Sequence, residues 1–171
     1  MQSSAKALGH PIHQQLVVFP IGLLATAVVF DVLRYITGHD GFASASYYMI
    51  AAGIISGLLA AVFGAIDYLA VPPGTRARRI GAMHGTGNVV VVVLFAVTWL
   101  LRSGEAGHVP TTLAFLVALL GALLATVTGW LGGELVDRLG VGVEPDANLD
   151  APASFGTGIH LHRSGHATSG R

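Results

Sequence analysis

Five ionisable side chains lie at the ends of long apolar segments and are the candidates for chemistry. They are His10, His13, Asp67, His84 and Glu134. An ionisable group near a bilayer interior is costly, about 2.5–3.5 kcal/mol at the centre of a spanning helix, and by default marks a functional position. If the four apolar segments run up and down through a membrane, all five side chains gather at one depth near one face.

Three chemistries and one structural alternative fit this set of side chains. Two imidazoles and two carboxylates facing a bundle core could bind a divalent metal. His13 and His84 could ligate a haem b axially, with Gly85 and Gly87 leaving room for the macrocycle. Histidines and carboxylates at one depth could also relay protons. The structural alternative is a polar layer at the interface, in which these groups meet water or arginines.

Further polar side chains accompany the set at helical spacing. Asn88 follows His84 by four positions, and Trp130 precedes Glu134 by four, so each pair shares a helix face. The two N-terminal histidines are three positions apart and lie on roughly one side, which suits either chelation or anchoring at the interface. The Glu-x-x-His spacing of di-metal bundles is absent from the sequence.

The opposite ends of the same segments carry a second group of polar and aromatic residues. Asp31 and Arg34 are three apart and are predicted to form an ion pair at the interface. The aromatic residues there, which fit a belt at the membrane surface, are Tyr35, Tyr47, Tyr48 and Trp99.

The composition of the 171-residue chain is that of a membrane protein. Hydrophobic residues make up 53% and charged residues 11%, and the formal net charge is zero. There is no basic surplus to bind nucleic acid. The chain has no cysteine, which excludes disulfides, thiolate metal sites, iron–sulfur ligation and a cysteine nucleophile. Hydrolase and nucleotide-binding motifs are also absent, so enzyme activity is not indicated.

Four apolar segments are long enough to cross a membrane as helices, at residues 16–36, 48–70, 80–101 and 111–135. Short connections make successive helices antiparallel neighbours, so we expect an all-α, up-down-up-down four-helix integral membrane bundle. Residues 1–15 form an N-terminal segment, 16–140 the transmembrane domain, and 141–171 a tail rich in small and polar residues. We expect this tail to be disordered, with His160, His162 and His166 in it.

The positions of lysine and arginine predict the orientation. Seven of the nine lie on the face that holds both termini, and two lie on the other face. The positive-inside rule therefore places both termini in the cytoplasm of a cell (plasma) membrane protein. The seven are Lys6, Arg76, Arg78, Arg79, Arg138, Arg163 and Arg171; the two are Arg34 and Arg102.

Small residues and one proline shape the packing between the helices. Pro20 is predicted to kink the first helix. Stripes of small residues at close to four-residue spacing favour close helix contacts, within the bundle or in a homo-oligomer. They are Gly53, Gly57, Ala61 and Gly64 in the second helix, and Gly121, Ala125, Gly129 and Gly133 in the fourth. In each successive pair of helices, a histidine opens the first helix and a carboxylate closes the second. This order indicates a two-plus-two internal repeat.

Several segments together resemble a bacterial membrane family, domain of unknown function 2231. They are residues 9–13 (GHPIH), 18–23 (VFPIGL), 30–33 (FDVL), 64–68 (GAIDY), 74–79 (GTRARR), His84 with Asn88, and 129–136 (GWLGGELV). The resemblance implies four membrane helices. It also implies redox electron transfer, because some relatives carry a Rieske iron–sulfur domain after the bundle. This chain departs from those relatives: it has no cysteine for such a domain, and Val18 stands where many relatives have a histidine.

These observations predict a membrane redox module with a redox partner protein. His10, His13 and His84 would hold a haem or a metal near the cytoplasmic face, with Asp67 and Glu134 as further metal ligands or as outer groups. Conduction of protons or divalent cations, and a purely structural role in the membrane, remain the alternatives.

Overall fold

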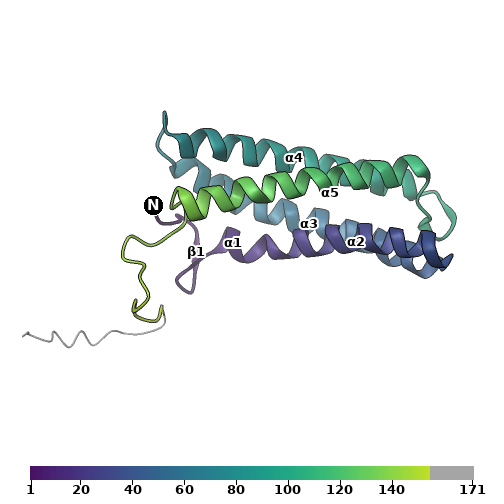
Figure 1. The fold of residues 1–171 in the computed structure, drawn as a ribbon, viewed down its shortest axis with the longest axis horizontal. Coiled ribbons are helices and arrows are strands. Elements are labelled where there is room, and N and C mark those ends of the chain that lie inside the picture. Colours follow the sequence, from purple (N-terminus) through teal and green to yellow (C-terminus); the bar gives the residue numbers. More distant parts are fainter. Residues whose placement is uncertain (155–171) are drawn as a thin grey trace, which may run out of the picture.

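The structure, a computed structural model that describes residues 1–154, is a bundle of four long helical segments (Figure 1). The first segment is α1 (Ile12–Leu16) followed by α2 (Val18–Thr37), and the others are α3 (Asp40–Ala70), α4 (Arg76–Arg102), and α5 (Thr112–Gly133) with a π-helical turn, η2 (Glu134–Arg138). The short elements are β1 (Lys6–Ala7), β2 (His10–Pro11) and η1 (Ala106–His108). All four segments are long and apolar enough to span a membrane, which confirms the predicted all-α bundle.

The chain enters and leaves the bundle at the same end. The N-terminus, α1, the α3–α4 connection and η2 lie at this end, which we call the N-terminal end (Figure 1). The α2–α3 and α4–α5 connections lie at the opposite end, called the far end below. The two polar groups predicted from the sequence therefore lie at opposite ends of the bundle.

The first helix is interrupted near Pro20, as the sequence predicts. The break falls at Val17, between α1 and α2, three positions before the proline. Proline has no N–H to donate to the carbonyl four positions earlier, which here belongs to Leu16, the last residue of α1. The hydrogen bonds resume with Ile21, whose N–H donates to the carbonyl of Val17 at 3.3 Å.

The second long helix begins at Asp40, eight residues earlier than the sequence pattern indicated. Gly38, with φ of 74°, ends α2 in the left-handed region, and only two residues separate α2 from α3. Asp40 in the first turn of α3 suits the positive end of the helix dipole. The following turns bury Ala43 and Ser46. Small and polar residues at the start of this helix mask its true length in a hydropathy pattern.

The middle of the bundle is a closed apolar layer. Its buried residues are Leu24 and Ala27 from α2, Ile50 from α3, Val91 and Phe95 from α4, and Ala118 from α5. Glycines let the helices of each hairpin approach closely. A Cβ on Gly53 would lie 2.5 Å from Leu24, and one on Gly121 would lie 3.0 Å from Phe95. These contacts explain part of the small-residue stripes.

The two hairpins, α1–α2 with α3 and α4 with α5, are an internal repeat. The contact of Phe95 with Gly121 repeats the contact of Leu24 with Gly53. Phe95 comes 71 positions after Leu24, and Gly121 comes 68 positions after Gly53. The same two spacings relate Ala27 to Thr98, and Ser46 to Ala114, which are all fully buried. A two-plus-two repeat is thus present in the packing, although the carboxylates that suggested it, Asp67 and Glu134, are 67 positions apart and are not equivalent in it.

The segment after η2 packs against the N-terminal segment. The N–H of Gly142 donates to the carbonyl of Met1 at 2.8 Å, and Lys6 forms an ion pair with Glu144. Gly142 and Glu144, at the start of the predicted tail, therefore contact the N-terminal segment. Residues 155–171 of the predicted tail, with His160, His162 and His166, lie outside the described residues.

Candidate functional site

The bundle brings together two of the predicted histidines, His13 and His84. Their ring centroids are 6.4 Å apart and their planes are nearly perpendicular, at 88°. His13 comes from α1 and His84 from α4, so each hairpin contributes one ring. We call these two residues the histidine pair. It lies in the part of the bundle toward the N-terminal end.

Each ring of the pair is held by the neighbouring helix of its own hairpin. Nδ1 of His13 lies 2.8 Å from the carbonyl oxygen of Ala60, and Nδ1 of His84 lies 2.8 Å from that of Thr128. A carbonyl oxygen can only accept, so Nδ1 donates in both hydrogen bonds. The lone pair of each neutral ring is therefore on Nε2.

A glycine beneath each ring makes this placement possible. A Cβ on Gly64 would lie 2.8 Å from Cε1 of His13, closer than real Cβ atoms come to other atoms. A Cβ on Gly132 would lie 3.1 Å from Cε1 of His84. The two glycines are 68 positions apart and the two histidines 71, the spacings of the internal repeat. The histidine pair is therefore made of equivalent residues.

The surroundings of the two Nε2 atoms differ. Nδ2 of Asn88 lies 3.1 Å from Nε2 of His84, and Oδ1 of Asn88 accepts from Oγ1 of Thr128 at 2.9 Å. Asn88 and His84 thus share a helix face, as predicted. The equivalent of Asn88 beside His13 is Val17, and within residues 1–154 no hydrogen bond reaches Nε2 of His13.

The two predicted carboxylates have other partners. Asp67 accepts from Oγ of Ser3 at 2.7 and 2.9 Å and from the N–H of Ser4 at 2.8 Å. Glu134 pairs with Arg76, at 2.6 Å. Among the described residues, no group of three or more histidine, aspartate or glutamate side chains is placed to hold a metal. The expected cluster of two imidazoles and two carboxylates does not assemble.

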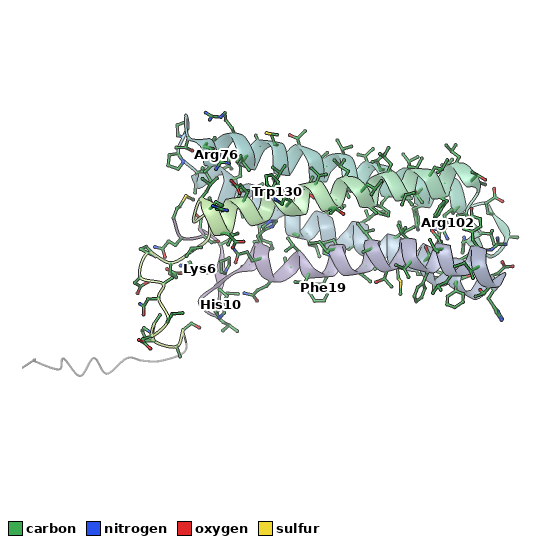
Figure 2. The ribbon with its side chains drawn as sticks, in the orientation of Figure 1. Lys6, His10, Phe19, Arg76, Arg102 and Trp130 are labelled. Atoms are coloured by element: carbon green, nitrogen blue, oxygen red, sulfur yellow. The ribbon has the colours of Figure 1, made fainter. Side chains whose placement is uncertain are left out.

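Two further predicted residues, His10 and Trp130, take no part in the contacts of the histidine pair; both are labelled in Figure 2. His10 lies in β2 on an exposed stretch, with Nε2 3.4 Å from Oγ of Ser154. Trp130 is 67% exposed on the outer surface of α5. In a membrane this side chain faces lipid.

The far end contains a fully buried ion pair that joins the two hairpins, between Asp31 and Arg102. Nη1 and Nη2 of Arg102 each donate to one carboxylate oxygen of Asp31, both at 3.0 Å. The remaining N–H groups donate to Oγ of Ser46 and to the carbonyls of Ala43 and His108, at 3.2, 2.9 and 2.9 Å. All five donors of the guanidinium are therefore satisfied.

The predicted pairing of Asp31 with Arg34 is wrong. Arg34 pairs instead with Asp40, at 3.1 Å on the surface. Asp31 lies on the inward face of α2, where it is fully buried. In the internal repeat it is equivalent to Arg102, 71 positions later, which is buried in the same way. Both residues occur in apolar helices, and their spacing was the signal that could have identified the pair.

The predicted aromatic belt divides between surface and interior. Tyr47 is buried, and its ring stacks on His108 with centroids 3.8 Å apart and on Trp99 with centroids 5.3 Å apart. Tyr35 and Tyr48 remain exposed, as a belt requires.

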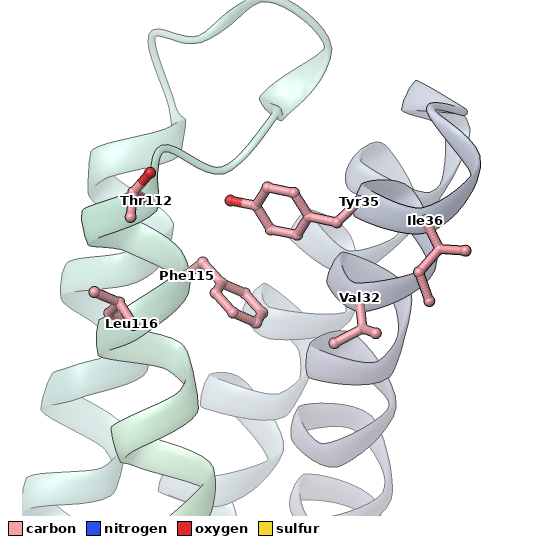
Figure 3. A pocket seen from close by; sticks show the side chains of 6 residues that line it. All are labelled: Val32, Tyr35, Ile36, Thr112, Phe115 and Leu116. Atoms are coloured by element: carbon pink, nitrogen blue, oxygen red, sulfur yellow. The ribbon is translucent and has the colours of Figure 1, made fainter.

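Two surface cavities of the bundle lie away from the histidine pair. The larger, about 470 Å³, is an open apolar groove between α2 and α5 at the far end (Figure 3). It is lined by Val32, Tyr35, Ile36, Thr112, Phe115 and Leu116. The second lies against α2 and α3 around Phe19 and Met49. Neither includes His13 or His84.

Comparison with known proteins gives a family and no closer relative. No curated protein matches the chain, and no solved structure matches it. The family model described as "Predicted membrane protein (DUF2231)" matches residues 9–145, which include both hairpins, the histidine pair and the buried ion pair. The chain therefore belongs to this family of predicted multi-pass membrane proteins.

Proposed function

We propose that the histidine pair holds a transition-metal ion between its two imidazoles, and that the protein is a small membrane redox module. The observation that carries this proposal is the geometry of the pair: two rings from opposite hairpins, 6.4 Å apart and nearly perpendicular. With metal–nitrogen bonds of about 2.0–2.1 Å, one ion bridges two rings at this separation when both turn Nε2 toward it.

The hydrogen bonds of the rings favour metal ligation. A histidine that binds a metal through one nitrogen usually donates its other N–H to a carbonyl or carboxylate, which fixes the ring. Both rings of the pair do this through Nδ1, to Ala60 and Thr128. Imidazole nitrogens suit copper, zinc, iron and nickel, and copper binds most tightly of the divalent ions. A copper ion would supply one-electron transfer.

The packing around His84 favours a single ion over a haem. Gly87 was expected to leave room for a macrocycle, but a Cβ there would lie 2.5 Å from Cγ2 of Thr128, so this side chain fills the space. A Cβ on Gly85 would meet nothing within 4 Å, so the space at this residue lies outside the packed helices. A haem would require α4 and α5 to separate.

The closed apolar layer argues against the alternative of a conduit. Between the histidine pair and the Asp31–Arg102 pair, the buried core residues of the described chain are apolar, among them Ile50 and Phe95, apart from Thr98, whose hydroxyl donates to the carbonyl of Ala114. Protons and cations cross membranes along polar side chains or water-filled cavities. A single threonine whose hydroxyl is bonded to a backbone carbonyl makes no such path, which leaves a site reached from one side.

The orientation of the chain would place this site near the cytoplasm. Both ends of the four-span region lie at the same end of the bundle, with Lys6, Arg76, Arg78, Arg79 and Arg138 (Figure 1). At the far end, Arg102 is neutralised by a buried partner, which leaves Arg34 near the surface. The positive-inside rule then favours cytoplasmic termini and a redox partner on the cytoplasmic side.

The test is metal binding by the full chain purified in detergent. We expect one copper per chain, and we expect His13→Ala and His84→Ala each to weaken binding at least tenfold. His10→Ala is the matched control, because His10 is exposed and outside the pair. An absorption spectrum of the protein as purified distinguishes a haem, which has a Soret band. Equal copper binding by all four proteins, or none by any, would leave the pair with a structural role.

A further inference from the structure

The two imidazoles of the histidine pair are equivalent in the repeat but not in their chemistry. Nε2 of His84 faces the side-chain amide of Asn88 at 3.1 Å. The equivalent position beside His13 is Val17, which carries no hydrogen-bonding side chain. Among the residues that the structure describes, a donor therefore occupies the lone pair of His84, and none reaches that of His13.

The direction of each hydrogen bond around His84 follows from its partners. Nδ1 must donate to the carbonyl of Thr128, so Nε2 of the neutral ring must accept, and the donor is Nδ2 of Asn88. Oδ1 of Asn88 then accepts from the hydroxyl of Thr128 at 2.9 Å. The network fixes the orientation of the Asn88 amide, with its NH2 group toward the imidazole.

We propose that Asn88 controls access to the second ligand of the metal site. An incoming ion binds first to Nε2 of His13, and His84 joins it only when the amide of Asn88 turns away. This inference rests on the proposed metal site and adds its regulating residue. Asn88 lowers the affinity for the ion, because its hydrogen bond to His84 must break before the second metal–nitrogen bond forms.

The internal repeat provides the substitution that tests this role. Asn88→Val places at α4 the residue that the first hairpin has at position 17. The hydroxyl of Thr128 keeps an acceptor in the carbonyl of Ala125, at 3.1 Å, so the change leaves no unpaired donor on Thr128. The net free energy of one hydrogen bond corresponds to a factor of about 2–10 in an equilibrium constant, and we expect a gain in copper affinity of this size.

The experiment measures copper affinity and the number of bound nitrogens in the full-length protein in detergent. The proteins are the unmodified chain, Asn88→Val, Asn88→Ala as a second variant, and His13→Ala. Electron paramagnetic resonance of the copper(II) protein counts the coordinated nitrogens. We expect two coordinated nitrogens in the unmodified chain and in both Asn88 variants, tighter copper binding in the two Asn88 variants, and weak binding in His13→Ala.

The outcomes separate this inference from the proposed function. If His13→Ala abolishes binding but the Asn88 variants bind no more tightly than the unmodified chain, the role of Asn88 is overturned and the metal site stands. If the Asn88 variants bind more weakly, Asn88 is itself a ligand and the inference is wrong. If His13→Ala binds copper as well as the unmodified chain, the metal site and the inference both fall.

Discussion

The buried Asp31–Arg102 pair permits a quantitative prediction about what holds the two hairpins together. The change is Arg102→Met, which keeps an apolar chain of similar length and removes the guanidinium. It leaves the carboxylate of Asp31 without its ion partner, at a site where both side chains are fully buried. It also removes the donors to Ser46 and to two backbone carbonyls.

The expected loss in the free energy of unfolding is about 3–5 kcal/mol, the usual cost of removing one partner from a buried ion pair. Arg34→Met is the matched control, because Arg34 forms an exposed pair with Asp40. Exposed pairs contribute about 0–1 kcal/mol. The double variant Asp31→Leu/Arg102→Met removes the isolated charge, so we expect it to recover part of the stability lost by Arg102→Met.

Unfolding of the purified protein by denaturing detergent, followed by circular dichroism, measures these differences. The reasoning is refuted if Arg102→Met is no less stable than Arg34→Met. It is also refuted if Asp31→Leu lowers the free energy of unfolding of Arg102→Met by as much as it lowers that of the unmodified protein. The two side chains would then act independently.

Two further predictions concern the support of the histidine pair and the orientation of the chain. Gly64→Ala places a Cβ 2.8 Å from the ring of His13, so we expect a lower melting temperature and weaker copper binding. A Cβ at Gly85 meets nothing within 4 Å, so Gly85→Ala should leave copper binding unchanged. It should leave the melting temperature unchanged or raise it slightly, since alanine favours a helix by about 0.5–1 kcal/mol relative to glycine. Equal losses in the two variants would contradict the packing. Reporter domains fused before Gln2 and after Arg171 should both give cytoplasmic signals, because the basic residues gather at the N-terminal end. A periplasmic signal from both would reverse the orientation, and a split result would contradict the four spans.

The sequence was sufficient to predict the fold class, because span length is a local property. A helix must carry about 20 apolar residues to cross a bilayer, and four segments of this chain do so. Local pattern was less informative at the helix ends. The start of α3, from Asp40, is rich in small and polar residues, so its sequence predicts a loop. In the structure some of these residues pack inward and the segment is helical.

The candidate site could be predicted only in part. His13 and His84 were identified because imidazoles are unusual near apolar segments, and the shared face of His84 and Asn88 follows from helix geometry. The same reasoning grouped Asp67 and Glu134 with them by depth. Depth alone does not decide contact, and both carboxylates found nearer partners, in Ser3 and Arg76.

By itself, the sequence determined that this chain forms four membrane-spanning helices in an up-and-down order, since hydrophobic length and short connections allow little else. Only the tertiary structure decided which faces meet. Asp31 reaches Arg102 rather than Arg34, and each histidine lies on a glycine of the next helix, because close glycine contacts set the rotation and register of every helix. These contacts join residues about 50 to 70 positions apart, which no local pattern specifies.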